Sequence, residues 1–148
     1  MADNTLVIFI SDNGPVWYPA DTKRLGHDAT GGWRGMKGDA WEAGHRMPFI
    51  VRWPGRVKAG AVSAQTICFT DLLATFAAML DAPLPPKAGE DSFNILPVLL
   101  GQQSEDKPIR GPVVVPSSGG FMTIRDGRWK LINDLGSGGF STAGRNST

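Results

Sequence analysis

The segment from Thr5 to Ser11 constrains the fold of this chain more than any other. Its sequence, TLVIFIS, is apolar on both alternating faces and rich in β-branched and aromatic residues. This pattern is typical of a strand buried on both sides of an α/β sheet. Such a strand needs neighbouring strands and crossover helices to cover it, yet it begins at the fifth residue. We therefore expect the chain to hold the back part of a larger α/β domain.

Composition excludes several classes of protein. The 148 residues include 15 Lys and Arg against 14 Asp and Glu, and 41% are hydrophobic, which is typical of a globular chain with a core. A net charge of +1 without a basic run argues against a nucleic-acid partner. The longest apolar run, Leu6 to Ile10, is too short to span a membrane, and the N-terminus has no signal-peptide pattern. Cys68 is the only cysteine, so no intrachain disulfide is possible.

The region between Asp12 and Met47 shows no sustained period of 2 or 3.6, only Gly, Pro, Asp and Trp in irregular order. We predict a long loop here, and a loop of this length in a compact domain is usually functional. Met47 to Trp53 (MPFIVRW) predicts a second buried strand, ended by Pro54 and Gly55.

The second half of the chain begins with a helical pattern. Apolar residues recur at helical spacing over Phe69 to Leu80, and Thr70 is the expected N-cap. Phe93 to Leu100 predicts a short helix or turn that ends at Gly101.

An antiparallel arrangement is expected further on. Val113 to Val115 predicts a strand, and the segments Phe121 to Arg125 and Arg128 to Ile132 flank the dipeptide Asp126-Gly127. That dipeptide is the signal for a hairpin with a two-residue type I′ turn. The Gly/Ser-rich residues from about 136 onward predict a flexible tail.

Ser11-Asp12-Asn13-Gly14 follows the first strand directly and is the sharpest candidate for chemistry. Ligands collect at the carboxyl ends of strands in open α/β sheets, and Asp and Asn offer hard oxygen atoms suited to Ca²⁺ or Mg²⁺. The alternative is a plain Asx-type turn, because Asn-Gly is a common turn dipeptide. Two side chains cannot satisfy a Ca²⁺ that takes about 6 to 8 oxygens, so further ligands would come from elsewhere.

The loop Gly35-Met36-Lys37-Gly38 returns toward the sheet just before the second strand. Its lysine could place an ammonium beside an anionic group at the same sheet edge, or could simply be solvated. Glu42 and Arg46 are spaced to form an ion pair that holds this loop. His27 and His45 have no partners at ligand spacing, so we interpret each as a loop residue with no specific role.

Together these segments resemble the sulfatase family within the alkaline-phosphatase-like superfamily. The matching segments run in family order along nearly the whole chain, which makes the set much more specific than any one member. They are Asn4 to Gly14, Gly35 to Gly38, Trp41 to Pro48, Thr70 to Leu72 and Ile124 to Ile132.

The resemblance implies a sulfate-ester hydrolase with one divalent cation, usually calcium, beside a formylglycine made from Cys or Ser. By position, Asp12 and Asn13 match metal ligands of the family, and Lys37 matches the lysine that contacts the substrate sulfate. A metal and an ammonium on opposite sides of a sulfate would stabilise the charge that develops on its oxygens and on the leaving group. The expected partner is a sulfated small molecule or glycan.

The implied fold has two parts. Residues 1–57 would complete the catalytic α/β domain with the last strands of its sheet. Residues 58–148 would form a smaller α+β subdomain with a helix and an antiparallel hairpin, ending in the flexible tail. We expect the chain to need the upstream part of the domain, or self-association, in order to fold.

The sequence also departs from the family pattern. The C-x-P-x-R nucleophile motif and the early Asp-Asp pair, both upstream in the family, do not occur here. Cys68 lacks the accompanying Pro and Arg and is interpreted as a small buried hydrophobic residue. Pro116 stands where related sequences often carry a His before the Ser, so a substrate contact there is in doubt. We therefore expect this chain alone to be inactive, with formylglycine only in the upstream part.

Two alternatives remain at this point. One is a phosphodiesterase or phosphonate hydrolase of the same superfamily, although such relatives more often present Asp-His metal ligands. The other is a non-catalytic remnant that binds a sulfated ligand, with Trp17, Trp33 and Trp41 stacking on sugars. Family members are often periplasmic, secreted or lysosomal, but the sequence does not define the compartment.

Overall fold

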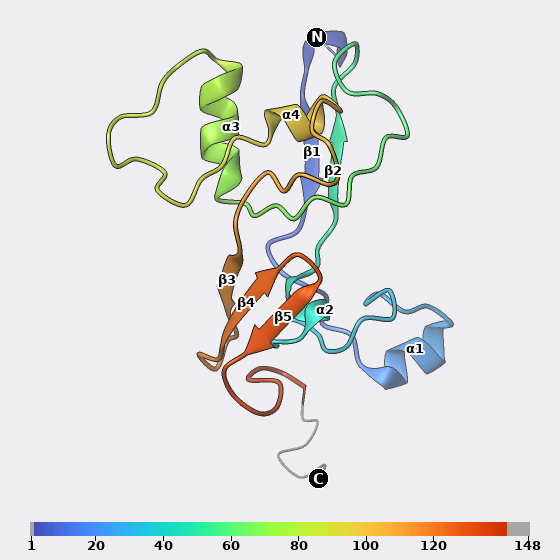
Figure 1. Ribbon diagram of the computed structural model, residues 1–148. Coiled ribbons are helices and arrows are strands. Elements are labelled where there is room, and N and C mark those ends of the chain that lie inside the picture. Colours follow the sequence, from blue (N-terminus) through green and yellow to red (C-terminus); the bar gives the residue numbers. More distant parts are fainter. Residues whose placement is uncertain (1, 142–148) are drawn as a thin grey trace. The chain divides into compact units, whose positions relative to one another are not determined.

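A computed structural model describes residues 2–141 and shows short helices and strands joined by long ordered loops (Figure 1). The described residues form two sheets, one of two strands and one of three. The elements in chain order are η1 (Ala2–Asn4), β1 (Val7–Ile10), α1 (Pro19–Leu25), α2 (Glu42–His45), β2 (Phe49–Arg52), α3 (Asp71–Met79), α4 (Leu96–Leu99), β3 (Val113–Pro116), β4 (Met122–Asp126) and β5 (Trp129–Ile132).

The chain divides into two compact units. The first comprises the chain up to Ile8 together with Val51–Gly111, and the second comprises Phe9–Ile50 together with the chain from Pro112 onward. Each unit is therefore built from segments far apart in the sequence. The sequence-based division after residue 57 concerns the domains of a complete family member and stays a prediction.

Strands β1 and β2 pair with each other and run in opposite directions (Figure 1). Both were predicted as strands, and the burial on both faces that is expected of them in a complete domain is not seen in this chain. Phe9 and Ile50 are each 61% exposed, because this sheet has only two strands among the described residues and its apolar side chains remain uncovered. An apolar surface of this kind favours association with another chain or segment.

Helix α3 confirms the predicted helix, although its cap differs from the prediction. The Thr70 side chain makes no capping hydrogen bond. The Asp71 carboxylate instead accepts a hydrogen bond of 2.7 Å from the Cys68 backbone N–H, which closes the turn before the helix. Cys68 is half-buried rather than buried as predicted.

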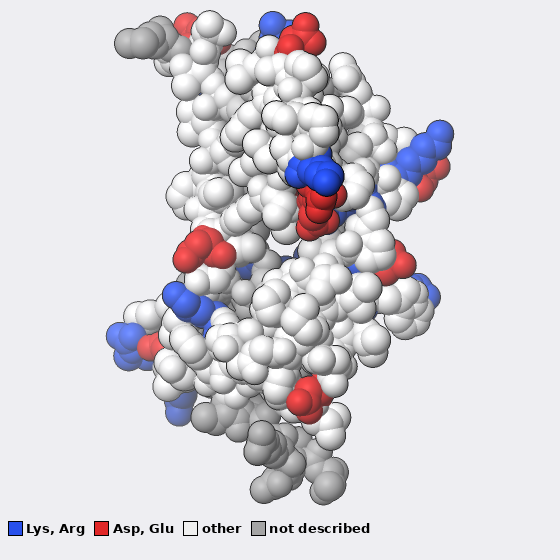
Figure 2. All heavy atoms as spheres, turned by 90° about the vertical axis from the view of Figure 1, so that its left-hand side faces the viewer, with Lys and Arg blue, Asp and Glu red and all other residues white. Residues whose placement is uncertain are grey.

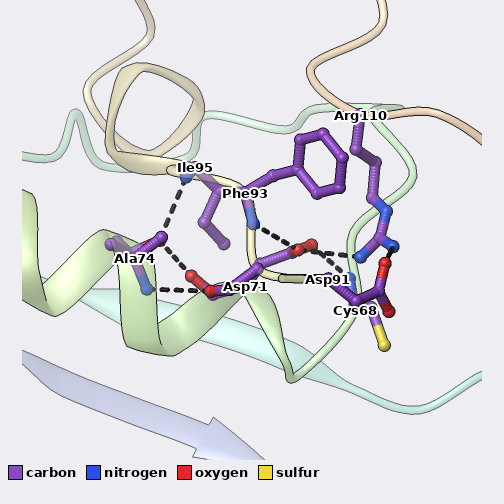
Figure 3. A network of polar contacts seen from close by, with 9 residues as sticks. Cys68, Asp71, Ala74, Asp91, Phe93, Ile95 and Arg110 are labelled. Carbon is purple, nitrogen blue, oxygen red and sulfur yellow. Dashed lines mark hydrogen bonds and ion pairs between the residues drawn. The ribbon is translucent and has the colours of Figure 1, made fainter. Parts of the chain in front are cut away.

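Asp71 is also the centre of a buried polar network, shown in Figure 3. Its other carboxylate oxygen accepts hydrogen bonds from the Phe93 backbone N–H at 3.0 Å and from Arg110 Nη1 at 2.7 Å. The side chains of Asp71 and Arg110 are 0% and 1% exposed. The Thr75 hydroxyl accepts a hydrogen bond from the Ile95 backbone N–H at 3.0 Å. These bonds fix α3 against the segment that leads into α4.

The three-stranded sheet of the second unit is antiparallel, with the strand order β3-β4-β5, as predicted for the hairpin. The turn type is a correction. Asp126 pairs with Trp129, so the two loop residues are Gly127 and Arg128. A type I′ turn requires positive φ at both loop residues, but only Gly127 has it, with φ of 52°.

Two helices lie in the region that was predicted to be one long loop. Helix α1 begins with Pro19 at its first position and ends at Gly26, whose φ is 63°. These are standard start and stop signals, but a helix of 7 residues is too short to show a sustained period. Helix α2 has only 4 residues and gives no periodic signal at all.

The first residues of the predicted flexible tail are held in place. The Ser137 carbonyl accepts a hydrogen bond of 2.6 Å from the Ala40 N–H. The Ser141 N–H donates to an Asp39 carboxylate oxygen at 3.0 Å. The rest of the predicted tail, residues 142–148, lies outside the described residues.

Within residues 2–141, none of the helices has the length and apolar character needed to cross a bilayer. On the face shown in Figure 2, acidic and basic side chains are interspersed in small groups rather than gathered by sign.

The buried ion pair gives a stability prediction. Arg110→Met would leave the Asp71 carboxylate buried without its cation, at a cost of about 3–5 kcal/mol of unfolding free energy. Asp91→Asn is the matched control, since Asp91 also bonds Arg110 but its side chain is 71% exposed, and we expect a loss of at most about 1 kcal/mol. Urea unfolding measures both. Equal losses for the two variants would contradict this account of the core.

Candidate functional site

The chain after β1 is joined by backbone hydrogen bonds to the loop that precedes β2. The Gly14 N–H donates to the Gly44 carbonyl at 3.1 Å, and the Lys37 N–H donates to the Pro15 carbonyl at 2.8 Å. The two segments singled out by sequence, one with Asp12 and the other with Lys37, are therefore brought together within the second unit.

Glycine is required at position 14 because the two segments approach so closely. A Cβ atom there would lie 1.6 Å from the Ala43 carbonyl oxygen. The Asn13-Gly14 dipeptide is thus more than a generic turn signal, since a larger residue would push Asn13 away from the loop around Lys37.

The side-chain oxygens of Asp12 and Asn13 are available to a ligand. Asp12 is exposed and Asn13 half-buried. The Asn13 amide donates from Nδ2 to the Gly14 carbonyl at 3.1 Å, and the Ser11 hydroxyl donates to the Asn13 carbonyl at 3.0 Å. An Asx turn requires a side-chain oxygen to accept a backbone N–H, and among residues 2–141 neither residue shows that bond.

These oxygens suit a hard divalent cation, but they are too few to enclose one. The part of the chain that the structure describes contains no group of three or more His, Cys, Asp or Glu side chains placed to hold a metal. Asp12 and Asn13 could supply only part of the roughly 6 to 8 oxygens around Ca²⁺. Their chemistry therefore fits one half of a calcium site.

Lys37 is half-buried, and its ammonium makes no hydrogen bond or ion pair with the residues the structure describes. Its turn is held by Asp39, whose fully buried carboxylate accepts hydrogen bonds from the Met36 N–H at 2.9 Å and the Ser141 N–H at 3.0 Å. The Gly38 carbonyl accepts a bond from the Ser118 N–H at 2.8 Å. A rigid turn thus presents an unpaired ammonium, which can attract an anion.

Glu42 binds three cationic side chains and thereby anchors the loop. Its carboxylate accepts hydrogen bonds from Arg46 Nε at 2.8 Å, from Lys130 Nζ at 3.1 Å and from Arg125. Burial raises the pKa of Glu42, but the hydrogen bonds from these three cations outweigh it and lower the pKa to about 2. The ion pair between Glu42 and Arg46 expected from sequence is present, and it is one part of a larger cluster.

Sequence reasoning missed the role of Arg125 and Lys130, although both lie in the segment that resembles the family. They are directly opposite each other on β4 and β5, so their side chains share one face of the hairpin. The hairpin signal together with the correct register could have identified them as a paired basic site.

His45 is the one titratable group of this loop with a buried, unpartnered atom. Within the described residues, its Nε2 has no hydrogen-bond partner. Burial, and to a lesser extent the nearby charge of Lys130, lowers the pKa of His45 to about 4. The imidazole is therefore neutral near pH 7. The His27 ring packs edge-on against the Trp17 ring, with 5.7 Å between the ring centres.

Comparison with known proteins gives the family. The sulfatase family model matches residues 1–82 of this chain. The N-acetylgalactosamine-6-O-sulfatase of Bacteroides thetaiotaomicron is 42% identical over 137 residues, which cover 89% of this chain and 26% of that protein. Human arylsulfatase A is 35% identical over 138 residues, which cover 88% and 25%.

A solved structure from work on glycosaminoglycan metabolism by Bacteroides thetaiotaomicron has a TM-score of 0.77 at 40% identity, covering 89% of this chain and 28% of that one. The fold class expected from the sequence is thereby confirmed. Together these matches show an α/β fold of the kind found in sulfatases, and this chain belongs to the sulfatase family. It spans about a quarter of the length of the curated relatives it matches.

The lowered pKa values of His45 and Glu42 give two separate pH windows in which acid destabilises the fold. For both groups the pKa is lower in the folded state than in the unfolded one, so the unfolded state binds more protons and stability falls as the pH falls. The contribution of His45 to the unfolding free energy is lost as the pH falls from 6.5, the ordinary pKa of His, to about 4, its pKa in the folded chain. The contribution of Glu42 is lost as the pH falls from 4.5, the ordinary pKa of Glu, to about 2, its pKa in the folded chain.

We expect His45→Gln to flatten the loss of unfolding free energy between pH 6.5 and 4 while leaving the fall below pH 4 in place. Urea unfolding at a series of pH values measures this. His27→Gln is the control, because His27 is exposed. A pH profile of His45→Gln identical to that of the parent chain would show that His45 is not the group that titrates.

Proposed function

We propose that these residues form one half of the active site of a sulfatase that hydrolyses sulfate esters. The observation that carries the proposal is the joining of the Asp12-Asn13 segment to the turn of Lys37 by the bond from the Lys37 N–H to the Pro15 carbonyl. This bond brings the side-chain oxygens of Asp12 and Asn13 and the unpaired ammonium of Lys37 into one set of hydrogen-bonded loops. A cation held by those oxygens and the ammonium can together stabilise the negative charge of a sulfate group.

In this assignment each residue has a separate role. Asp12 and Asn13 hold a divalent cation, with calcium favoured, and that cation supplies Lewis-acid stabilisation of the sulfate when bound. Lys37 binds a sulfate oxygen through its ammonium. Glu42 and Arg46 keep the loop in place. The nucleophile, a formylglycine in this family, would come from residues outside these 148, because C-x-P-x-R is absent from them.

The sulfatase names of the relatives favour sulfate esters over the phosphoryl-transfer alternative. The substrate class supported by the same relatives is a sulfated glycan, since one is named for N-acetylgalactosamine 6-sulfate chemistry and a similar structure comes from work on glycosaminoglycans. The non-catalytic binding remnant would share the Lys37 contact but would have no turnover in any longer protein.

The assignment of Lys37 is tested by kinetics in a longer protein that carries this chain together with its upstream segment. Lys37→Ala should lower kcat/KM for an aryl sulfate by about 10²–10³-fold, because a charge-stabilising donor is lost. Lys23→Ala, an exposed lysine of α1, is the matched control and should change little. The 148-residue chain alone should show no turnover. Turnover by the chain alone, or full activity of Lys37→Ala, would refute the assignment.

The metal assignment has a readout that is independent of activity. We expect the chain to bind Ca²⁺ weakly, with Kd on the order of 10⁻³ M, because it supplies only part of the ligand shell. Isothermal titration should show that Asp12→Ala and Asn13→Ala remove this binding. Asp28→Ala should not, because the Asp28 carboxylate already accepts hydrogen bonds from Thr30 and Gly32. Calcium binding unchanged in Asp12→Ala would rule out the half-site.

A further inference from the structure

Two arginines of the Lys37 loop are held over tryptophan rings rather than only in ion pairs. The Arg34 guanidinium carbon lies 3.6 Å from the centre of the Trp41 ring. That of Arg46 lies 4.1 Å from the centre of the Trp33 ring. Trp41 is buried, whereas Trp33 is 46% exposed. Stacking fixes both guanidinium groups in position without consuming their N–H donors.

Those donors are largely free. Within residues 2–141, the Arg34 guanidinium makes no hydrogen bond and no ion pair, and the Arg46 guanidinium uses only its Nε, which donates to Glu42. An arginine held in this way can still give paired hydrogen bonds to a planar or tetrahedral anion.

The acids of the same loop cannot neutralise these arginines. Asp39 is fully buried, and its carboxylate accepts two backbone N–H bonds. Glu42 is shared among Arg46, Arg125 and Lys130, so its charge is already compensated. A net positive charge therefore remains around Arg34 and Arg46, and an anionic ligand would be attracted there.

This pair of arginines lies close to the candidate sulfate site along the hydrogen-bonded backbone. The Arg34 carbonyl accepts a hydrogen bond of 3.0 Å from the Ala43 N–H. The neighbouring Gly44 carbonyl in turn accepts the Gly14 N–H, which follows Asn13 directly. Lys37 itself lies three residues after Arg34 in the same loop. A ligand longer than one sugar could reach from Lys37 to these arginines.

We propose that Trp33, Arg34 and Arg46 form a second subsite, which binds the neighbouring sugar of a polyanionic glycan whose sulfate ester lies at Lys37. The exposed part of the Trp33 ring contacts a sugar face, and the guanidinium groups bind a sulfate or carboxylate on that sugar. The subsite rests on the proposed function for the place of the first sulfate. It adds a preference for a second anionic group.

The test uses the longer protein that carries this chain together with its upstream segment, in a variant whose C-x-P-x-R nucleophile is replaced by Ala so that no probe is hydrolysed. Binding of four probes is measured by tryptophan fluorescence and by calorimetry. These are N-acetylgalactosamine 6-sulfate and three disaccharides in which the second sugar is neutral, carboxylated or sulfated. We expect the anionic disaccharides to bind about 10-fold more tightly than the monosaccharide and the neutral disaccharide, as charged hydrogen bonds allow. The carboxylated and sulfated arms show which anion the subsite takes.

Arg34→Gln should abolish this 10-fold preference and leave the affinity for the monosaccharide unchanged. Trp33→Ala should weaken every disaccharide and leave the monosaccharide unchanged. Arg128→Gln is the matched control, because Arg128 lies over Trp129 in the same way at 4.8 Å and Trp129 is 69% exposed. It should change nothing.

Equal affinity for all probes, no detectable binding, or an unchanged preference in Arg34→Gln would overturn the subsite. Lys37→Ala separates this result from the proposed function. If it weakens all four probes and Arg34→Gln has no effect, the sulfate site stands and the subsite fails. If Lys37→Ala changes nothing while Arg34→Gln removes the preference, the subsite stands and the sulfate site fails.

Discussion

The candidate site depends on the ion pairs that the Glu42 carboxylate makes with three cationic side chains. Glu42 belongs to a helix of only 4 residues, which could not be stable alone. Three cations bind it, one from just beyond that helix and two from the hairpin of β4 and β5. Because the hairpin holds Glu42, the loop that carries Lys37 has a fixed end. The low pKa of Glu42 keeps this anchor charged at any physiological pH.

The second constraint is steric and comes from glycine. At Gly14 a side chain would collide with the Ala43 carbonyl, and at Gly44 it would lie 2.2 Å from the Asp39 carbonyl oxygen. Backbone therefore packs directly on backbone between the metal-ligand segment and the lysine turn. The candidate site residues Asp12, Asn13 and Lys37 lie on loops, but hydrogen bonds hold these loops in fixed positions.

Sequence reasoning could predict elements whose pattern is local and long enough. Helix α3, the hairpin and the two strands β1 and β2 were all predicted from periodicity or turn residues. The position of the hairpin turn was predicted wrongly. The dipeptide Asp126-Gly127 favours a loop made of those two residues, whereas the cross-strand pair of Asp126 with Trp129 makes Gly127 and Arg128 the loop.

The candidate site was predicted only as separate pieces. Lys37, Asp12 and Asn13 were identified by motif, but their convergence depends on long-range backbone bonds that leave no periodic signal. Arg46 was predicted as a partner of Glu42, but the two partners from the hairpin, Arg125 and Lys130, lie 83 and 88 positions further along the chain. The positions of Arg34 and Arg46 over tryptophan rings likewise follow from folding and not from spacing.

The central claim is that these residues are one half of a sulfatase site, and the most direct test is to determine the coding sequence upstream of the Met1 codon. We predict an in-frame segment that contains an Asp-Asp pair and a C-x-P-x-R motif, which would supply the remaining metal ligands and the nucleophile. A stop codon close upstream of Met1 would contradict the claim, because the chain would then exist without the other half of the site.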